Sequence, residues 1–318
     1  MSEMVSMGMP VYNGGCYIRE AIEGLLGQSY ENFELIISDN GSTDETMDIC
    51  EEYARSDSRI RVYHNEENVG AAANYNRVFA LSRGKYFKWA AHDDICRAGF
   101  LERCLEGFAS EGEETVLCYP ETVTIDAAGS EQGVYDGNIK VCQPSADGRL
   151  GYLLRNLKQC NMVHGLIRSE ALRRTELIGN YFASDVVLLS ELVLQGKVRR
   201  VGGNLFLRRM HPGMSRRAHK SWEEVAKWFD PANKGKVVLP LCNLTVQIMR
   251  AIERSGLGAA EKAACWVVVA EDWCGRYWRQ MGGEAKTLAR TAMARVRRRE
   301  RKFDGVAAVY EGKSVSCT

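Results

Sequence analysis

Three short polar segments in the first hundred positions carry side chains that commonly bind ligands. Each follows an apolar run: Tyr12-Asn13, Asp39 and His92-Asp93-Asp94. Adjacent carboxylates can hold a hard divalent cation such as Mg²⁺ or Mn²⁺, which neutralises charge on a departing phosphate group. These residue types therefore predict a site for a phosphorylated ligand and a cation.

The elements that position these residues alternate between strand and helix patterns. Short apolar runs predict strands at 4–9, 33–38, 60–64 and 86–91. Helical periodicity predicts helices over 17–28 and 71–82, and a capping-box pattern of Ser42 with Glu45 predicts where another helix begins. Such alternation implies a parallel, doubly wound sheet, in which ligands bind beyond the carboxyl ends of the strands. The three polar segments are therefore expected to converge.

The pattern becomes irregular beyond residue 117. Strands are expected at 123–126, 162–167 and 204–210, with helices near 150–157 and 185–195. From about residue 221 onward only helical periodicity is found, over 222–229, 238–254 and 259–279. A mixed second half followed by a helical appendage is therefore predicted.

Composition narrows the class of protein. The chain is 45% hydrophobic and 26% charged, as is usual for globular proteins, and its formal net charge of +1 predicts no attraction to nucleic acid. Its 11 cysteines are scattered without a CxxC pair, which favours a reducing compartment. Its apolar stretches fall short of the ~20 residues that span a bilayer. We therefore expect a cytoplasmic protein.

Four motifs, in this order, resemble those of family 2 glycosyltransferases of GT-A fold. They are Met9-Pro10-Val11-Tyr12-Asn13, Ser38-Asp39-Asn40-Gly41-Ser42-Thr43-Asp44, Asn68-Val69-Gly70 and His92-Asp93-Asp94. The resemblance implies an α/β, Rossmann-like domain with a mostly parallel sheet over residues 1–217, and the helical extension then covers 218–318. It also implies an inverting, metal-assisted enzyme of polysaccharide biosynthesis that moves a sugar from a nucleoside-diphosphate donor, most simply UDP-linked, to a glycan or lipid-linked acceptor.

The resemblance also implies roles for individual residues. Asp39 would accept hydrogen bonds from the nucleotide base, Tyr12 would pack on it, and Asp93 would face the ribose or sugar. Further donor contacts carried over by motif are Pro10, Val11, Asn13, Asn76 and Asp94. The implied metal ligands are Asp94, His92 and His211.

Three positions depart from the family pattern. His92 replaces the first acid of a DxD motif, and Tyr75 stands where many relatives carry arginine. In the segment that resembles the family's catalytic ED motif, Ser184 replaces the first acid and Asp185 occupies the position of the general base. Glu191, almost two helical turns later, is expected to point elsewhere.

These departures leave two alternatives open. One is a noncatalytic nucleotide-sugar-binding or scaffold protein, because two expected acids are replaced. The other is a sugar-phosphate nucleotidyltransferase, although the glycine-rich phosphate loop of that class is not found after the first strand.

Basic residues in the last third of the chain suggest further contacts. Arg216 and Arg217 follow His211 and could neutralise phosphate, whereas the basic segment 286–302 could be a solvated helix face. Its interleaved apolar residues also permit peripheral docking on the inner face of a membrane, where lipid-linked acceptors would lie.

Overall fold

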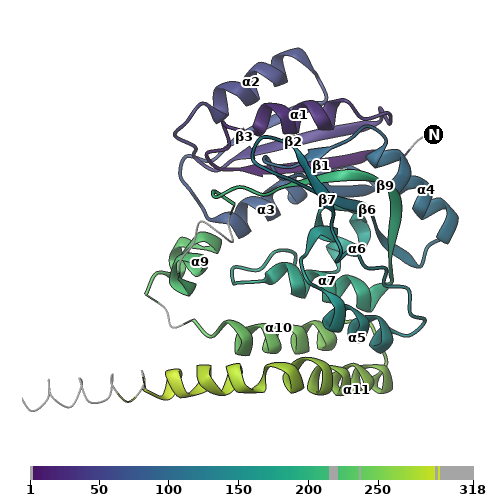
Figure 1. Cartoon of the computed structure of the whole chain (residues 1–318), viewed down its shortest axis with the longest axis vertical. Helices are drawn as coiled ribbons and strands as arrows, with labels where there is room; N and C mark the ends of the chain where they lie inside the picture. Colours follow the sequence, from purple (N-terminus) through teal and green to yellow (C-terminus); the bar gives the residue numbers. More distant parts are fainter. Residues whose placement is uncertain (1–2, 215–220, 236–237, 291–292, 294–318) are drawn as a thin grey trace, which may run out of the picture.

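The structure is a computed structural model of the whole chain, and it describes residues 3–214, 221–235, 238–290 and 293. A nine-stranded sheet lies at its centre with helices on both faces (Figure 1). The strand order is β3-β2-β1-β4-β8-β6-β9-β5, and β7 pairs with β6 outside this path. The predicted α/β architecture is confirmed.

The amino-terminal half is the parallel part of the sheet. Its strands are β1 (Val5–Val11), β2 (Phe33–Asp39), β3 (Ile60–His64) and β4 (Tyr86–Trp89). The connecting helices are α1 (Ile18–Leu26), α2 (Thr46–Ser56) and α3 (Ala71–Ala80). Every residue of β1 and β2 is buried, as expected for central strands covered on both faces.

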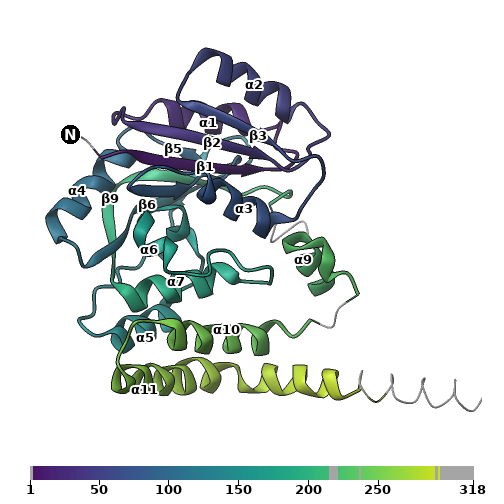
Figure 2. The same cartoon turned by 180° about the vertical axis from the view of Figure 1, so that it is seen from behind.

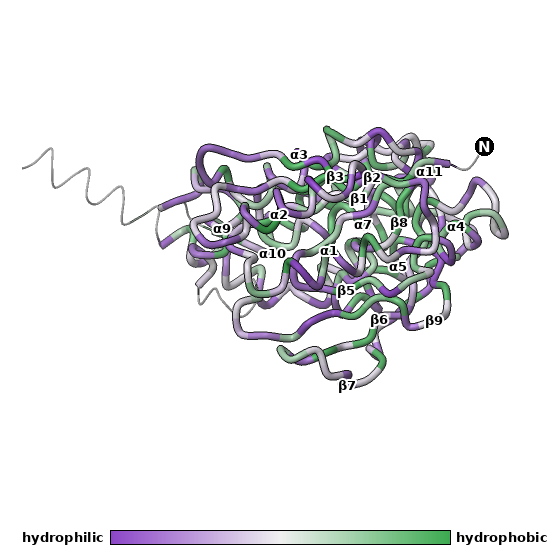
Figure 3. Tube along the Cα trace, turned by 90° about the horizontal axis from the view of Figure 1, so that it is seen from above, coloured by the Kyte–Doolittle hydropathy of each residue, from purple (hydrophilic) through white to green (hydrophobic). Residues whose placement is uncertain are grey.

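The second half of the sheet is mixed. Its strands are β5 (Ile95–Cys96), β6 (Thr115–Ile125), β7 (Glu131–Val134), β8 (Leu166–Arg168) and β9 (Lys197–Arg209). Strand β8 runs antiparallel to β4 and β6, and β5 runs antiparallel to β9, whereas β9 is parallel to β6. Strand β7 projects from the body of the molecule with all its residues exposed (Figure 3).

Four helices of this half pack on the sheet, one on one face and three on the other. They are α4 (Phe100–Glu111), α5 (Ala146–Asn156), α6 (Ser169–Arg173) and α7 (Ser184–Gln195). One hydrophobic cluster joins α1, α2 and α4 to one face of the sheet, and a second joins α3, α5 and α7 to the other. Helix α7, which carries Asp185, is therefore part of the second layer.

Two local predictions were wrong. The expected strand at 162–167 is a 3-10 helix, η1 (Asn161–His164), and only Leu166–Arg168 pairs as a strand. The expected capping box is absent, because the Ser42 hydroxyl instead accepts a hydrogen bond from the Asn13 N–H, 2.8 Å away. Helix α2 therefore begins at Thr46 without a side-chain cap.

The carboxy-terminal helices lie below the sheet (Figure 2). They are α9 (Trp222–Phe229), the 3-10 turn η2 (Pro231–Asn233), α10 (Pro240–Arg254) and α11 (Ala259–Val268), which continues as the π-helical segment η3 (Val269–Cys274). Buried side chains of α10 and α11 share the hydrophobic cluster of α5 and α7. The predicted boundary at 217/218 lies outside the described residues. None of the helices described is long and apolar enough to cross a bilayer.

Candidate functional site

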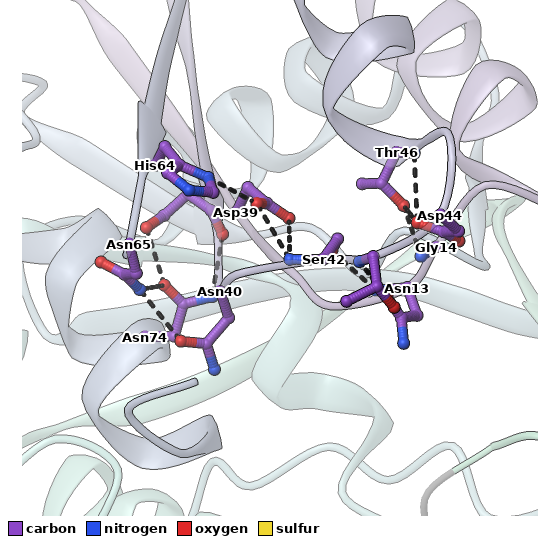
Figure 4. Close-up of polar contacts among 12 residues, drawn as sticks. Asn13, Gly14, Asp39, Asn40, Ser42, Asp44, Thr46, His64, Asn65 and Asn74 are labelled. Atoms are coloured by element: carbon purple, nitrogen blue, oxygen red, sulfur yellow. Dashed lines mark hydrogen bonds and ion pairs between the residues drawn. The ribbon is translucent and has the colours of Figure 1, made fainter. Parts of the chain in front are cut away.

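The loops after β1 and β2 are joined by hydrogen bonds at the carboxyl end of the sheet (Figure 4). The N–H of Asn13 donates to the Ser42 hydroxyl at 2.8 Å, and the Thr43 N–H donates to Asn13 Oδ1 at 2.9 Å. Gly14 N–H donates to the Thr46 hydroxyl at 2.8 Å. Asn13 itself has a φ of 50°, a left-handed conformation that asparagine tolerates. These bonds fix the loop that follows β1.

Asp39 lies inside this arrangement rather than on its surface. It is 0% exposed, and its Oδ2 accepts from Ser42 N–H at 3.1 Å and lies 2.9 Å from Nδ1 of His64. Pro10 and Val11 are buried as well. Tyr12, in contrast, is 44% exposed, so a ligand beyond the strand ends can reach its ring.

A network of asparagines holds the Asn68-Val69-Gly70 motif against β2. Asn40 Oδ1 accepts from the Val69 N–H at 3.1 Å, and its amide donates to Asn68 Oδ1 at 3.0 Å. Gly70 has a φ of 90°, and a Cβ there would lie 2.6 Å from the Phe229 carbonyl oxygen. Only glycine fits this position, which explains why the motif ends with it.

Asn76 is not brought into this group. Its amide donates to the Ile178 carbonyl at 2.9 Å and accepts from the Ile178 N–H at 3.0 Å. Both halves of the side chain are thus engaged in joining α3 to the segment before α7. A donor contact by Asn76 stays a prediction.

The acidic pair after β4 is held by two segments of the distant β9 region. Asp93 Oδ2 lies 2.9 Å from Nε2 of His211, and Asp94 Oδ1 accepts from the Arg209 N–H at 2.9 Å. Burial would raise the pKa of Asp93, but the nearby His92 and His211 lower it below its usual value. Burial and the charge of Asp93 raise the pKa of Asp94 to about 7. The two carboxyl groups thus lie in different environments.

The expected metal ligands come only partly together. Burial lowers the pKa of His92, which favours the neutral imidazole that a metal requires. Within the described part of the chain, however, no group of three or more His, Cys, Asp or Glu side chains is arranged to hold a metal ion. Mg²⁺ commonly takes one or two protein carboxylates and completes its shell with water and substrate phosphate. The neighbouring Asp93 and Asp94 fit that partial donor set.

Asp185 lies in the first turn of α7, where its Oδ1 accepts from the Val186 N–H at 3.0 Å. The helix follows Ala183, whose φ of 57° is unusual for alanine. Burial raises the pKa of Tyr75, and the charges of Asp93, Asp94 and Asp185 raise it further. Tyr75 is therefore within electrostatic reach of both the acidic pair and the α7 terminus.

Two arginines near the end of β9 were missed by the sequence predictions. Arg209 is 2% exposed, and it forms an ion pair with Glu20 and donates to the Asp93 carbonyl at 3.0 Å. Arg208 alternates to the other face and donates to Asn161 Oδ1. The two consecutive arginines shortly before His211 were the available signal. Spacing alone could not distinguish an arginine that is bonded within the fold, as Arg209 is, from one that can bind a ligand.

Some predicted contacts fall on undescribed residues. Arg216 and Arg217 lie outside the described residues, as does most of the basic segment 286–302. Their predicted roles therefore have no structural counterpart here.

Residues 6–182, more than half of the chain, match Glycosyl transferase family 2. Curated relatives include the glycosyltransferase GlyG of Streptococcus pneumoniae, 35% identical over 37% of this chain and 39% of that protein. Another is the putative teichuronic acid biosynthesis glycosyltransferase TuaG of Bacillus subtilis, 39% identical over 32% of this chain and 41% of TuaG. The matches thus span less than half of each relative's length.

A solved structure with the same fold is residues 1–349 of S. aureus TarS in complex with UDP-GlcNAc. Its TM-score is 0.60 at 18% identity, with 81% of this chain and 69% of that chain covered. At that identity the likeness concerns the fold, which is the GT-A arrangement predicted from the motifs. The match over residues 6–182 shows that the chain belongs to glycosyltransferase family 2.

Proposed function

We propose that this enzyme transfers a sugar with inversion from a UDP-linked donor to a glycan or lipid-linked acceptor. The observation that carries the proposal is the placement of the partly buried Asp93 and the buried Asp94 beyond β4, at the same edge of the sheet as Asp39 and the exposed Tyr12. Ligands of open α/β sheets bind at this edge. Support comes from TarS, which has been solved with UDP and with UDP-GlcNAc.

Asp185 is the proposed general base. Inversion requires removal of a proton from the acceptor hydroxyl on the face opposite the leaving diphosphate, and a positioned carboxylate can accept that proton. Asp185 lies in the first turn of α7, and the left-handed conformation of Ala183 just before the helix fixes the position of its backbone. The proton passes from the acceptor oxygen to Asp185 as that oxygen bonds to the sugar carbon and the donor's diphosphate leaves with its bonding electrons.

The leaving diphosphate requires positive charge nearby. A bound Mg²⁺ or Mn²⁺, held by Asp94 with His92 and His211 as further candidate ligands, would neutralise part of that charge. A mannosyltransferase from Pyrobaculum calidifontis, which resembles this chain with a TM-score of 0.55 at 13% identity, has been solved in complex with GDP-Man and Mn²⁺. We assign His211 a second role, since its ring contacts Asp93 directly and can fix that carboxylate.

Arg208 is a further candidate cation. Among the described residues it forms no ion pair, and its guanidinium donates a hydrogen bond to Asn161 Oδ1. Its charge lowers the pKa of Asp94 against the effects of burial, so it acts on the acidic pair. An anionic group of the donor or acceptor would form an ion pair with the Arg208 guanidinium.

Peripheral contact with the cytoplasmic face of a membrane is part of the same proposal. Trp266 and Trp278 on the last helix are 45% and 62% exposed. Tryptophan is enriched at membrane interfaces, and a basic segment follows in the sequence. The helical extension, proposed as residues 218–318, would then hold the enzyme near a lipid-linked acceptor.

The test compares Asp185→Asn with the native enzyme in an assay of nucleoside diphosphate release from UDP-sugars, with and without candidate acceptors. Loss of a general base should lower the transfer rate by about 10²- to 10⁴-fold. Donor affinity should stay unchanged, because the amide is isosteric. Asp147→Asn is the matched control, since Asp147 also lies in the first turn of a helix, α5. Native transfer by Asp185→Asn would assign the base elsewhere.

A further inference from the structure

Arg208, near the end of β9, lies beside the short 3-10 helix η1. Phe206 and Arg208 point to the same face of the strand, because side chains two positions apart share a face. The ring of His164 stacks on Phe206 with the ring centroids 5.5 Å apart, and the Arg208 guanidinium donates a hydrogen bond to Asn161 Oδ1. Both ends of η1 are therefore held against one face of β9.

Arg208 is also close to the groups of the proposed reaction. The N–H of the next residue, Arg209, donates to Asp94 Oδ1 at 2.9 Å. Burial raises the pKa of Tyr75, the acidic pair and Asp185 raise it further, and the charge of Arg208 lowers it. Arg208 is therefore within electrostatic reach of a hydroxyl that both the acidic pair and the proposed base also influence.

The Asn161 side chain has a donor end without a partner. A guanidinium only donates hydrogen bonds, so the amide oxygen faces Arg208 and the amide nitrogen is the other end. Asn161 is 3% exposed, and its Nδ2 is a buried atom with no hydrogen-bond partner in the described parts of the chain. Buried donors without an acceptor are rare in native proteins, and a bound ion is one of the ordinary explanations.

The hydroxyl of Tyr135 is a second buried group near the same guanidinium. It has no hydrogen-bond partner among the residues that the structure describes. Burial raises the pKa of Tyr135 and the charge of Arg208 opposes that rise, so the guanidinium acts on this hydroxyl. Because its pKa is raised, the hydroxyl keeps its proton at neutral pH and can donate a hydrogen bond. The adjacent acid, Asp136, is paired with Lys158 at 2.7 Å.

The elements that carry these donors lie on the acceptor side of the sheet. Tyr135 follows β7 and Asn161 begins η1, and both belong to the chain between β6 and β8. In the strand order, β6 and β8 are separated from β1, β2 and β3 by β4. The donor's nucleotide is proposed to lie beyond β1 and β2, so a ligand at Arg208 would lie on the other side of the acidic pair.

We propose that Arg208, Asn161 and Tyr135 form an anion subsite for the acceptor, which therefore carries a carboxylate or phosphate group near the hydroxyl that receives the sugar. The inference rests on the proposed transfer reaction and names the chemical class of its acceptor. A carboxylate or a phosphate has enough lone pairs to accept hydrogen bonds from all three side chains, and its charge compensates the guanidinium. A neutral glycan would leave the guanidinium without a counter-charge.

The test compares matched ligands by calorimetry in the presence of saturating UDP and Mg²⁺, which fill the proposed donor site. Methyl glucuronide is compared with methyl glucoside, and geranyl phosphate with geraniol. One of the anionic ligands should bind about tenfold more tightly than its neutral counterpart, the effect of one charged hydrogen bond. The pair that shows the preference identifies the source of the anion, a sugar carboxylate or a lipid phosphate.

Two substitutions should remove this preference by different routes. Arg208→Gln removes the positive charge, whereas Asn161→Asp keeps the charge and pairs it with a carboxylate inside the protein. Both variants should bind the anionic and the neutral ligand of each pair with equal affinity. Arg200→Gln is the matched control, because Arg200 lies at the other end of β9, where it pairs with Glu121 at 3.6 Å. It should keep the native preference.

The outcomes separate the inference from the proposed function. The inference alone is overturned if the native enzyme binds UDP but shows no charge preference in either pair, or if folded Arg208→Gln keeps the preference. Weaker UDP binding by Arg208→Gln with an intact preference among acceptors would assign the guanidinium to the donor's diphosphate. Failure of the native enzyme to bind UDP or to release it from any UDP-sugar would overturn the proposed function itself. The comparison on the native enzyme decides the matter even if a variant does not fold.

Discussion

Replacing Gly14 by alanine tests whether the loop after β1 positions the His92-Asp93-Asp94 triplet. A Cβ on Gly14 would lie 2.7 Å from Cδ2 of His92 and 2.7 Å from Cγ2 of Val11. Ordinary carbon contacts are about 3.5 Å, so both neighbours must give way, each by roughly 0.8 Å. Gly14 cannot move away easily, because its N–H bonds to Thr46 and its carbonyl accepts from the start of α1.

His92 is the neighbour expected to move further. Val11 is 2% exposed and belongs to the hydrophobic core, whereas His92 is only partly buried. Overpacking of this kind costs about 1–3 kcal/mol. A shift of the triplet approaching 1 Å should also lower donor turnover by about 10- to 100-fold.

The assay combines urea unfolding with nucleoside diphosphate release. Gly202→Ala is the matched control, because a Cβ there meets nothing within 4 Å and its φ is not in the left-handed range. A folded Gly14→Ala enzyme with native turnover would refute the claim that this contact positions the triplet.

Three further substitutions test other parts of the site. Ala183→Gly should raise the free energy of unfolding by about 0.5–1 kcal/mol in urea titrations, since glycine adopts the left-handed conformation without strain. Glu191→Ala should lower it by about 1–3 kcal/mol, because it removes the acceptor of the Arg254 guanidinium, 2.7 Å away, and of the Glu176 N–H, 3.1 Å away. Arg208→Ala should weaken donor or acceptor binding by about tenfold in steady-state kinetics, the effect of one charged hydrogen bond, without unfolding the 3-10 helix η1 that begins at Asn161.

Controls for these substitutions come from exposed groups of the same kind. Arg200→Ala removes a guanidinium from the other end of β9, where it pairs at 3.6 Å with Glu121, and should leave the kinetics unchanged. Glu170→Ala removes one partner of an exposed pair and should change stability by less than about 1 kcal/mol. Equal effects at the control and test positions would contradict the assigned roles.

Much of the donor half could be predicted because local pattern and burial agree there. Strands β1 and β2 are buried along their whole length, so short, mainly apolar runs identified them. The run that includes Met162 and Val163 is buried too, but in a 3-10 helix, and periodicity cannot separate short buried strands from short buried helices. The predicted start of α2 was wrong for a different reason. The Ser42 hydroxyl accepts a hydrogen bond from the Asn13 N–H across the loop and does not cap the helix.

The site could be predicted as a set of residues but not as a set of contacts. Motif positions identified Asp39, Asp93 and His211 individually. Their decisive partners are distant in sequence: Asp93 meets His211 118 residues later, and Asp39 meets His64 25 residues later. No spacing rule specifies such pairs, because they depend on the register of strands from different parts of the chain.

Helix α7, which carries the proposed base, and the carboxy-terminal helices of the same hydrophobic cluster lie beyond the family match. The match ends at residue 182, just before Asp185 and helix α7. Glu191 on that helix bonds to Arg254 of α10, and the buried side chains of α7, α10 and α11 belong to one cluster. The buried residues of the last helix recur every four positions: Cys265, Val269 and Trp273. In a regular α-helix of 3.6 residues per turn, side chains four positions apart would turn progressively away from α10. The π-helical segment keeps them aligned. The position of the proposed base, Asp185 on α7, is thereby coupled by packing to the carboxy-terminal helices.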